Sequence, residues 1–103
     1  MTSKSLEHWK TSGHYFKWRE HSIFYQDQGK GDALLCLHGF PTASYDWQRI
    51  WPSLAKHFRV IGFDLLGFGF SDKPRRHRYS ILEQADIVAG LLASLNIRRT
   101  HIL

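Results

Sequence analysis

Two turns carry the residue types best suited to chemistry in this chain of 103 residues. The first reads His38-Gly39-Phe40-Pro41 and directly follows an apolar run over residues 34–37. Glycine allows a sharp bend, and the ring of Pro41 restricts Phe40 to extended geometry. The backbone N–H of Phe40 is then able to bind an oxyanion. Spacing alone favours a simpler interpretation, a rigid turn in which a buried His38 hydrogen-bonds to backbone.

The second turn follows an apolar run over residues 60–63, and its notable residues are Asp64, Gly67, Gly69, Ser71 and Asp72. A carboxylate beside glycines invites comparison with the dinucleotide-binding fingerprint. In that fingerprint, however, the glycines follow the first strand and the acid comes later. The G-x-x-x-x-G-K-[ST] phosphate loop is absent from the sequence as well. We therefore do not expect a nucleotide site at this turn.

The two apolar runs are typical of strands covered on both faces, and a helix between them would complete a β-α-β unit. Ligands of open α/β sheets bind at the carboxyl ends of such strands, where both turns lie. We expect the helix to begin at Ser44, which is able to cap it, and to break before Pro52, which lacks a backbone donor. Helical spacing predicts sheet packing for Trp47, Ile50, Trp51 and Leu54.

Further elements flank this unit. Alternating residues predict strands over 14–19 and 22–26, paired as an edge hairpin, whereas residues 1–13 read as a loosely ordered polar lead-in. A capping box at Ser80 predicts a helix that ends at Asn96. Its expected apolar face comprises Ile81, Ala85, Val88, Leu92 and Leu95. Residues 101–103 read as an unfinished strand, so residues 14–103 are expected to be the N-terminal portion of a larger domain.

Composition places the chain among ordinary globular proteins, with 43% hydrophobic and 22% charged residues. The formal net charge is +5, and the densest basic cluster, Lys73–Arg78, reads as a solvated loop rather than a nucleic-acid patch. Cys36 is the single cysteine and is expected in the core. No apolar stretch approaches about 18 residues. We expect a cytoplasmic protein with no membrane or nucleic-acid partner, no metal and no cofactor.

The order and separation of the two turns resemble the α/β-hydrolase superfamily, especially its epoxide hydrolase and haloalkane dehalogenase branch. The resemblance runs from about Tyr15 to Leu103. It implies an α/β fold in which an edge hairpin and parallel strands with flanking helices form the N-terminal part of the hydrolase domain. It also implies that the Phe40 N–H is half of an oxyanion hole. The remaining matched residues shape the two turns: His38, Gly39, Pro41, Asp64, Gly67, Gly69 and Ser71.

By this resemblance, a nucleophile supplied further along the chain forms a covalent ester that water hydrolyses. Haloalkane dehalogenases usually carry Asn where Phe40 stands, which favours a small apolar epoxide, ester or haloacid substrate here. The next strand would begin at Thr100–Leu103 and run beside residues 33–37. The sequence shows no nucleophile elbow, and none of its seven histidines is assigned as the base.

We therefore expect the 103-residue chain to be inactive alone and to associate through the unpaired edge of its last strand. Two alternatives remain open at this point. One is a non-catalytic, truncated scaffold that acts by binding. The other is a small basic nucleic-acid-binding module built around Lys73–Arg78.

Overall fold

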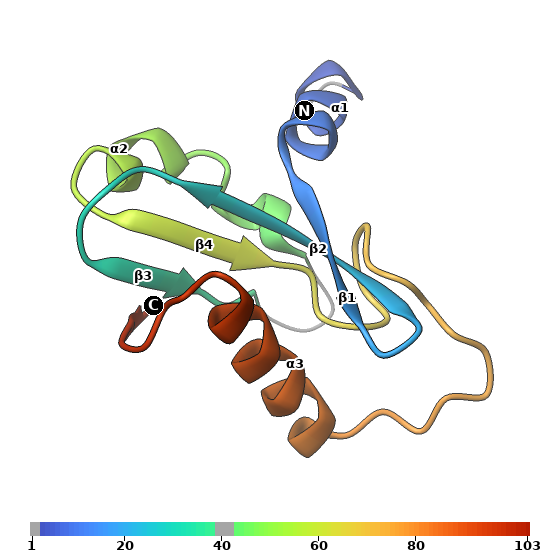
Figure 1. The fold of residues 1–103 in the computed structure, drawn as a ribbon. Coiled ribbons are helices and arrows are strands. Elements are labelled where there is room, and N and C mark those ends of the chain that lie inside the picture. The colour runs from blue at the N-terminus through green and yellow to red at the C-terminus, as the bar shows by residue number, and fades with distance from the viewer. Residues whose placement is uncertain (1–2, 39–42) are drawn as a thin grey trace.

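A five-stranded mixed sheet organises the molecule in the computed structural model, which describes residues 3–38 and 43–103 (Figure 1). The strand order is β1-β2-β4-β3-β5. β2 pairs antiparallel with β1 and β4, whereas β3 pairs parallel with β4 and β5. The edge hairpin and the position of the last strand beside β3 are as the sequence predicts. The bounds are β1 (His14–Trp18), β2 (His21–Gln28), β3 (Ala33–Cys36), β4 (Arg59–Phe63) and β5 (His101–Ile102).

Both faces of the sheet are covered. Successive residues of a strand point to opposite faces, so neighbouring residues pack into different layers. Leu35 and Ile61 lie on the face that packs against helix α3 (Ile81–Ser94). Leu34 and Val60 lie on the other face, with Trp9 of helix α1 (Ser3–Ser12) and Trp51 of helix α2 (Trp51–Ala55). The result is a sheet between two helical layers (Figure 1).

Helix α1 corrects the expectation of a loosely ordered lead-in over residues 1–13, because Ser3–Ser12 are helical. Its anchor is Trp9, which is only 6% exposed. The Trp9 ring lies edge-on to Trp51, with 5.1 Å between centroids, and Gln26 Nε2 donates to the Trp9 carbonyl over 2.6 Å. Tertiary packing of one aromatic residue thus stabilises a helix whose polar sequence gives no periodic signal.

The connection from β3 to β4 contains two short helices. A 3₁₀ helix, η1 (Ser44–Trp47), comes first, and α2 follows after a break, with Pro52 in its first turn. The break before Pro52 is therefore confirmed. The predicted cap is not, because Ala43 occupies the N-cap position and the Ser44 side chain is fully buried. Ile50 is 44% exposed, so it does not join the core as expected.

Helix α3 begins and ends where its signals indicate. Ser80 Oγ accepts the Glu83 N–H over 3.0 Å, and Asn96 follows the helix at a φ of 60°, a left-handed conformation typical of helix C-termini. The predicted apolar face is wrong in part. Ile87 and Leu91 are fully buried, whereas Ile81 is 88% exposed. Apolar residues occur on two sides of this helix, so periodicity alone does not choose between them.

The single cysteine lies in the core. Cys36 is fully buried, as expected, and burial raises the pKa of its thiol to about 11. Within residues 3–38 and 43–103, none of the helices has the length and apolar character needed to cross a bilayer.

Candidate functional site

His38 ties the end of β3 to the end of β4. Its Nε2 accepts a hydrogen bond from the Leu65 backbone N–H over 3.0 Å, and its ring centroid lies 5.7 Å from that of Phe68. The side chain is buried, with 8% exposure. His38 therefore makes the backbone contact that the simpler interpretation of the sequence describes. Gly39, Phe40 and Pro41 lie outside the described residues, so the oxyanion assignment of Phe40 stays a prediction.

Asp64, at the exit of β4, is a buried carboxylate bonded to backbone donors. One oxygen, Oδ1, accepts the Ser44 N–H over 2.6 Å, and Oδ2 accepts the Phe70 N–H over 2.8 Å. The residue is 1% exposed, where such charge-assisted bonds are strong. Because both oxygens are engaged, Asp64 acts as a support that joins two turns rather than as a group presented to substrate.

The glycines and the serine of the second turn let the backbone close around Asp64. Gly69 has a φ of 53°, and a Cβ atom there would overlap Asp64 Oδ2. Gly67 has a φ of 94°, and a Cβ atom there would lie 2.9 Å from the Tyr79 ring. Ser71 Oγ donates to the Asp64 carbonyl over 2.6 Å and accepts the Phe24 N–H over 2.9 Å. The turn is thus fastened to both β4 and β2.

Consecutive residues of the β4 exit hold both sides of the segment 39–42. His38, before that segment, is bonded to Leu65, and Ser44, after it, is bonded to Asp64. We call His38, Ser44, Asp64 and Leu65 the paired-turn cluster. Sequence reasoning identifies His38 and Asp64 but misses the role of Ser44. The sequence predicts Ser44 only as a helix cap and gives no sign of its bonds to distant residues.

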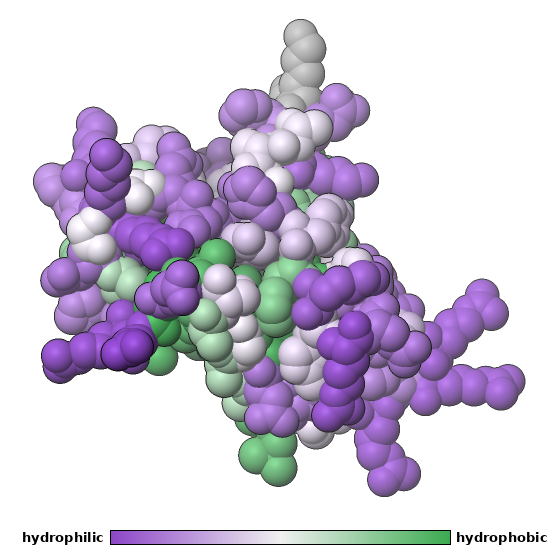
Figure 2. Space-filling model, in the orientation of Figure 1, coloured by the Kyte–Doolittle hydropathy of each residue, from purple (hydrophilic) through white to green (hydrophobic). Residues whose placement is uncertain are grey.

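A hollow of about 640 Å³ lies beside this cluster, at the N-terminal end of α3. It shares Leu65 and Phe68 with the surroundings of His38. Its walls are mainly hydrocarbon and aromatic, and Figure 2 shows apolar side chains projecting near this end of α3, at the bottom of the view. Such a wall suits an apolar group of a ligand. The lining residues are Leu65, Gly67, Phe68, Tyr79, Ser80, Ile81 and Gln84.

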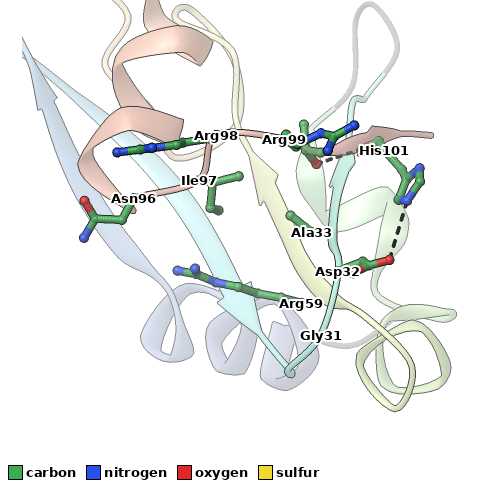
Figure 3. Close-up of a pocket in the computed structure, with 10 residues that line it drawn as sticks. Gly31, Asp32, Ala33, Arg59, Asn96, Ile97, Arg98, Arg99 and His101 are labelled. Atoms are coloured by element: carbon green, nitrogen blue, oxygen red, sulfur yellow. Dashed lines mark hydrogen bonds and ion pairs between the residues drawn. The ribbon is translucent and has the colours of Figure 1, made fainter.

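A second hollow, of about 660 Å³, lies at the opposite ends of the parallel strands (Figure 3). Three arginines line it, but they do not converge. Arg59 forms an ion pair with Asp27 over 2.7 Å, and this hydrogen-bonded pairing raises the pKa of Arg59. Arg98 and Arg99 point in opposite directions. This hollow is therefore a weaker candidate than the one beside the paired-turn cluster.

Metal-ligating side chains are scattered. In the part of the chain that the structure describes, no group of three or more His, Cys, Asp and Glu residues is placed to hold a metal ion.

Known proteins share this arrangement of turns and strands. The sequence model of the alpha/beta hydrolase fold matches residues 32–103. The chain belongs to the alpha/beta hydrolase fold family. It is 52% identical to the mesoderm-specific transcript protein of Mus musculus, covering 97% of this chain and 31% of that protein. It is 41% identical to a haloalkane dehalogenase of Sphingobium indicum, covering 71% of this chain and 26% of that protein.

Solved structures of the family agree with the fold. An alpha/beta hydrolase fold protein from Burkholderia ambifaria superposes with a TM-score of 0.81 at 36% identity, covering 86% of this chain and 33% of its own. Est816, described as an N-acyl homoserine lactone degrading enzyme, gives 0.82 at 32% identity, covering 86% and 34%. The chain spans about a third of the length of the curated relatives that it matches at this identity.

Proposed function

We propose that the protein is a hydrolase that acts through a covalent ester intermediate. In this proposal the present chain supplies the turn whose Phe40 N–H stabilises the anionic oxygen, and a later part of the full-length protein supplies nucleophile, acid and base. The supporting observation is the paired-turn cluster, in which both flanks of the segment 39–42 are bonded to the exit of β4. An oxyanion donor is effective because the protein aligns it before the reaction begins.

The substrate we propose is small and apolar: an epoxide, an ester or a haloacid. The hollow beside Leu65 and Phe68 supports this, because its walls are largely apolar. Phe40 has no side-chain donor for a halide ion, which favours these three classes over haloalkanes. The related haloalkane dehalogenase and lactone-degrading enzyme support a hydrolytic reaction in general terms.

The reaction is tested on the full-length protein with an aryl ester, an aryl epoxide and a 2-haloacid. We expect turnover of at least one class, and acid quenching followed by intact-mass spectrometry should detect the covalent ester adduct. The 103-residue chain serves as the control and should turn over none of them. Absence of both turnover and adduct for all three classes would refute the hydrolase proposal. If the 103-residue chain alone turned over a substrate and a substitution within it abolished that turnover, the proposal that a later part of the protein supplies nucleophile, acid and base would be refuted.

A further inference from the structure

Trp9 lies far from the paired-turn cluster in sequence but reaches it through space. Its indole Nε1 donates a hydrogen bond to Ser44 Oγ over 3.2 Å, a contact between residues 35 positions apart. Both partners are buried, with 6% exposure for Trp9 and none for Ser44. Because water has little access to either group, each needs a protein partner, and among the described residues they bond to each other.

Ser44 is consequently held in two ways. Its side chain accepts from Trp9, and its backbone N–H donates to Asp64 Oδ1 over 2.6 Å. One bond restrains the side chain and the other restrains the peptide plane. Together they fix Ser44 where the chain leaves the segment 39–42 and enters η1.

The donor is itself anchored. Gln26 of β2 is 4% exposed, and its Nε2 donates both to the Trp9 carbonyl, over 2.6 Å, and to Ser12 Oγ, over 3.1 Å. The Trp9 ring lies edge-on to Tyr45 and Trp51, with centroid distances of 6.1 and 5.1 Å, an arrangement that aromatic pairs prefer. Helix α1 therefore presents its indole N–H to Ser44 from a position fixed by β2 and α2.

We propose that Trp9 is a positioning residue for Ser44, at the start of η1. Its indole N–H sets the orientation of Ser44, whose backbone N–H is bonded to Asp64. The kinetic consequence rests on the function proposed above, whereas the coupling between Trp9 and Ser44 does not. A purely structural Trp9 would contribute to the core beneath α1 and would leave residues 43–50 unaffected when the fold is intact.

Two variants of the full-length protein remove this hydrogen bond from opposite sides. Trp9→Phe keeps an aromatic ring in the core but removes the donor, and Ser44→Ala keeps the indole but removes the acceptor. Ile87→Val is the matched control, since Ile87 is buried on the other face of the sheet. All variants are compared well below their melting temperatures, so that global unfolding does not contribute.

Hydrogen–deuterium exchange tests the coupling without reference to activity. Peptides covering residues 43–50 should exchange about tenfold faster in Trp9→Phe and in Ser44→Ala than in the parent, because the hold on Ser44 is weakened. The double variant should exchange no faster than the quicker single variant. Exchange equal to that of Ile87→Val, or additive effects in the double variant, would overturn the inference.

Kinetics test the consequence for the reaction. If the full-length protein turns over one of the three substrates, both single variants should lower kcat about tenfold with KM nearly unchanged, as misalignment of a transition-state contact requires. Ile87→Val should change kcat less than twofold. A fall in kcat no larger than that of the control would overturn the positioning role. If no substrate is turned over, the proposed function fails and the exchange experiment still decides the coupling.

Discussion

Asp64 accepts hydrogen bonds from two segments that are separate in sequence. Its partners are the N–H groups of Ser44 and Phe70, and its side chain is withdrawn from water. A buried carboxylate is tolerated when donors replace its lost hydration. Here the two donors come from different turns and replace that hydration. The carboxylate in turn fixes the distance between the two turns.

Replacing Asp64 with asparagine should therefore destabilise the fold. An amide accepts at one oxygen only, and its NH₂ group would face a backbone donor. We expect Asp64→Asn to lower the free energy of unfolding by about 3 kcal/mol, measured by urea denaturation. Asp46→Asn is the control, because Asp46 is exposed, and it should cost less than about 0.5 kcal/mol. Similar losses in the two variants would show that the Asp64 bonds contribute little.

Sequence patterns identify some of the residues around Asp64 but not others. Turn chemistry and the resemblance direct attention to His38 and Asp64, because both end apolar runs. The bond from Trp9 to Ser44 spans 35 positions and belongs to no motif. Only the fold brings these two side chains together, so no pattern in the sequence predicts the contact.

At the scale of elements, helix α3 depends on its N-terminal cap. The Ser80 side chain accepts the Glu83 N–H over 3.0 Å, satisfying one of the donors that a helix start leaves unpaired. We expect Ser80→Ala to lower the free energy of unfolding by about 1 kcal/mol. Ser53→Ala, at an exposed position of α2, should change it by less than about 0.5 kcal/mol. Thermal denaturation would compare them, and equal effects would refute the capping contribution.

The elements differ in how well the sequence specifies them. The strands β3 and β4 are apolar on both faces, and their bounds lie within one residue of the predicted runs. Helix α1 escapes prediction because a single Trp9 creates no hydrophobic period. Helix α3 is predicted in extent, but its buried side is predicted wrongly in part, because Ile87 and Leu91 are buried against the sheet whereas Ile81 is exposed.

At the scale of the whole molecule, β5 forms one end of the described sheet. It bonds to β3 on one side, and Ile102 is 66% exposed. We propose that the 103-residue chain, produced alone, associates through this edge, because unpaired edge strands template further pairing. Sedimentation velocity should show oligomers.

A charge at the edge tests that association. Ile102→Lys should shift the 103-residue chain toward monomer, because a lysine on an edge strand opposes pairing with a second strand. Ile50→Lys is the control, since it places the same charge at an exposed apolar position away from β5. Equal shifts in both variants would point to general solubility, and no shift in Ile102→Lys would exclude the β5 edge as the contact.

The two turns and their separation identify the family before any contact is known. The nucleophile, acid and base are not assigned within the present chain, which spans about a third of the length of its relatives. The contribution that we propose for it is therefore the backbone donor of Phe40, together with the residues that flank the segment 39–42.

The most direct test of that contribution removes the Phe40 N–H from the full-length protein. Phe40→Pro deletes the donor, whereas Phe40→Leu replaces the side chain and retains the donor. With melting temperatures recorded to confirm folding, we predict that kcat/KM falls about 10²–10³-fold in Phe40→Pro and less than about threefold in Phe40→Leu. A folded Phe40→Pro variant with kcat/KM within a few fold of the parent would contradict the oxyanion role assigned to this turn.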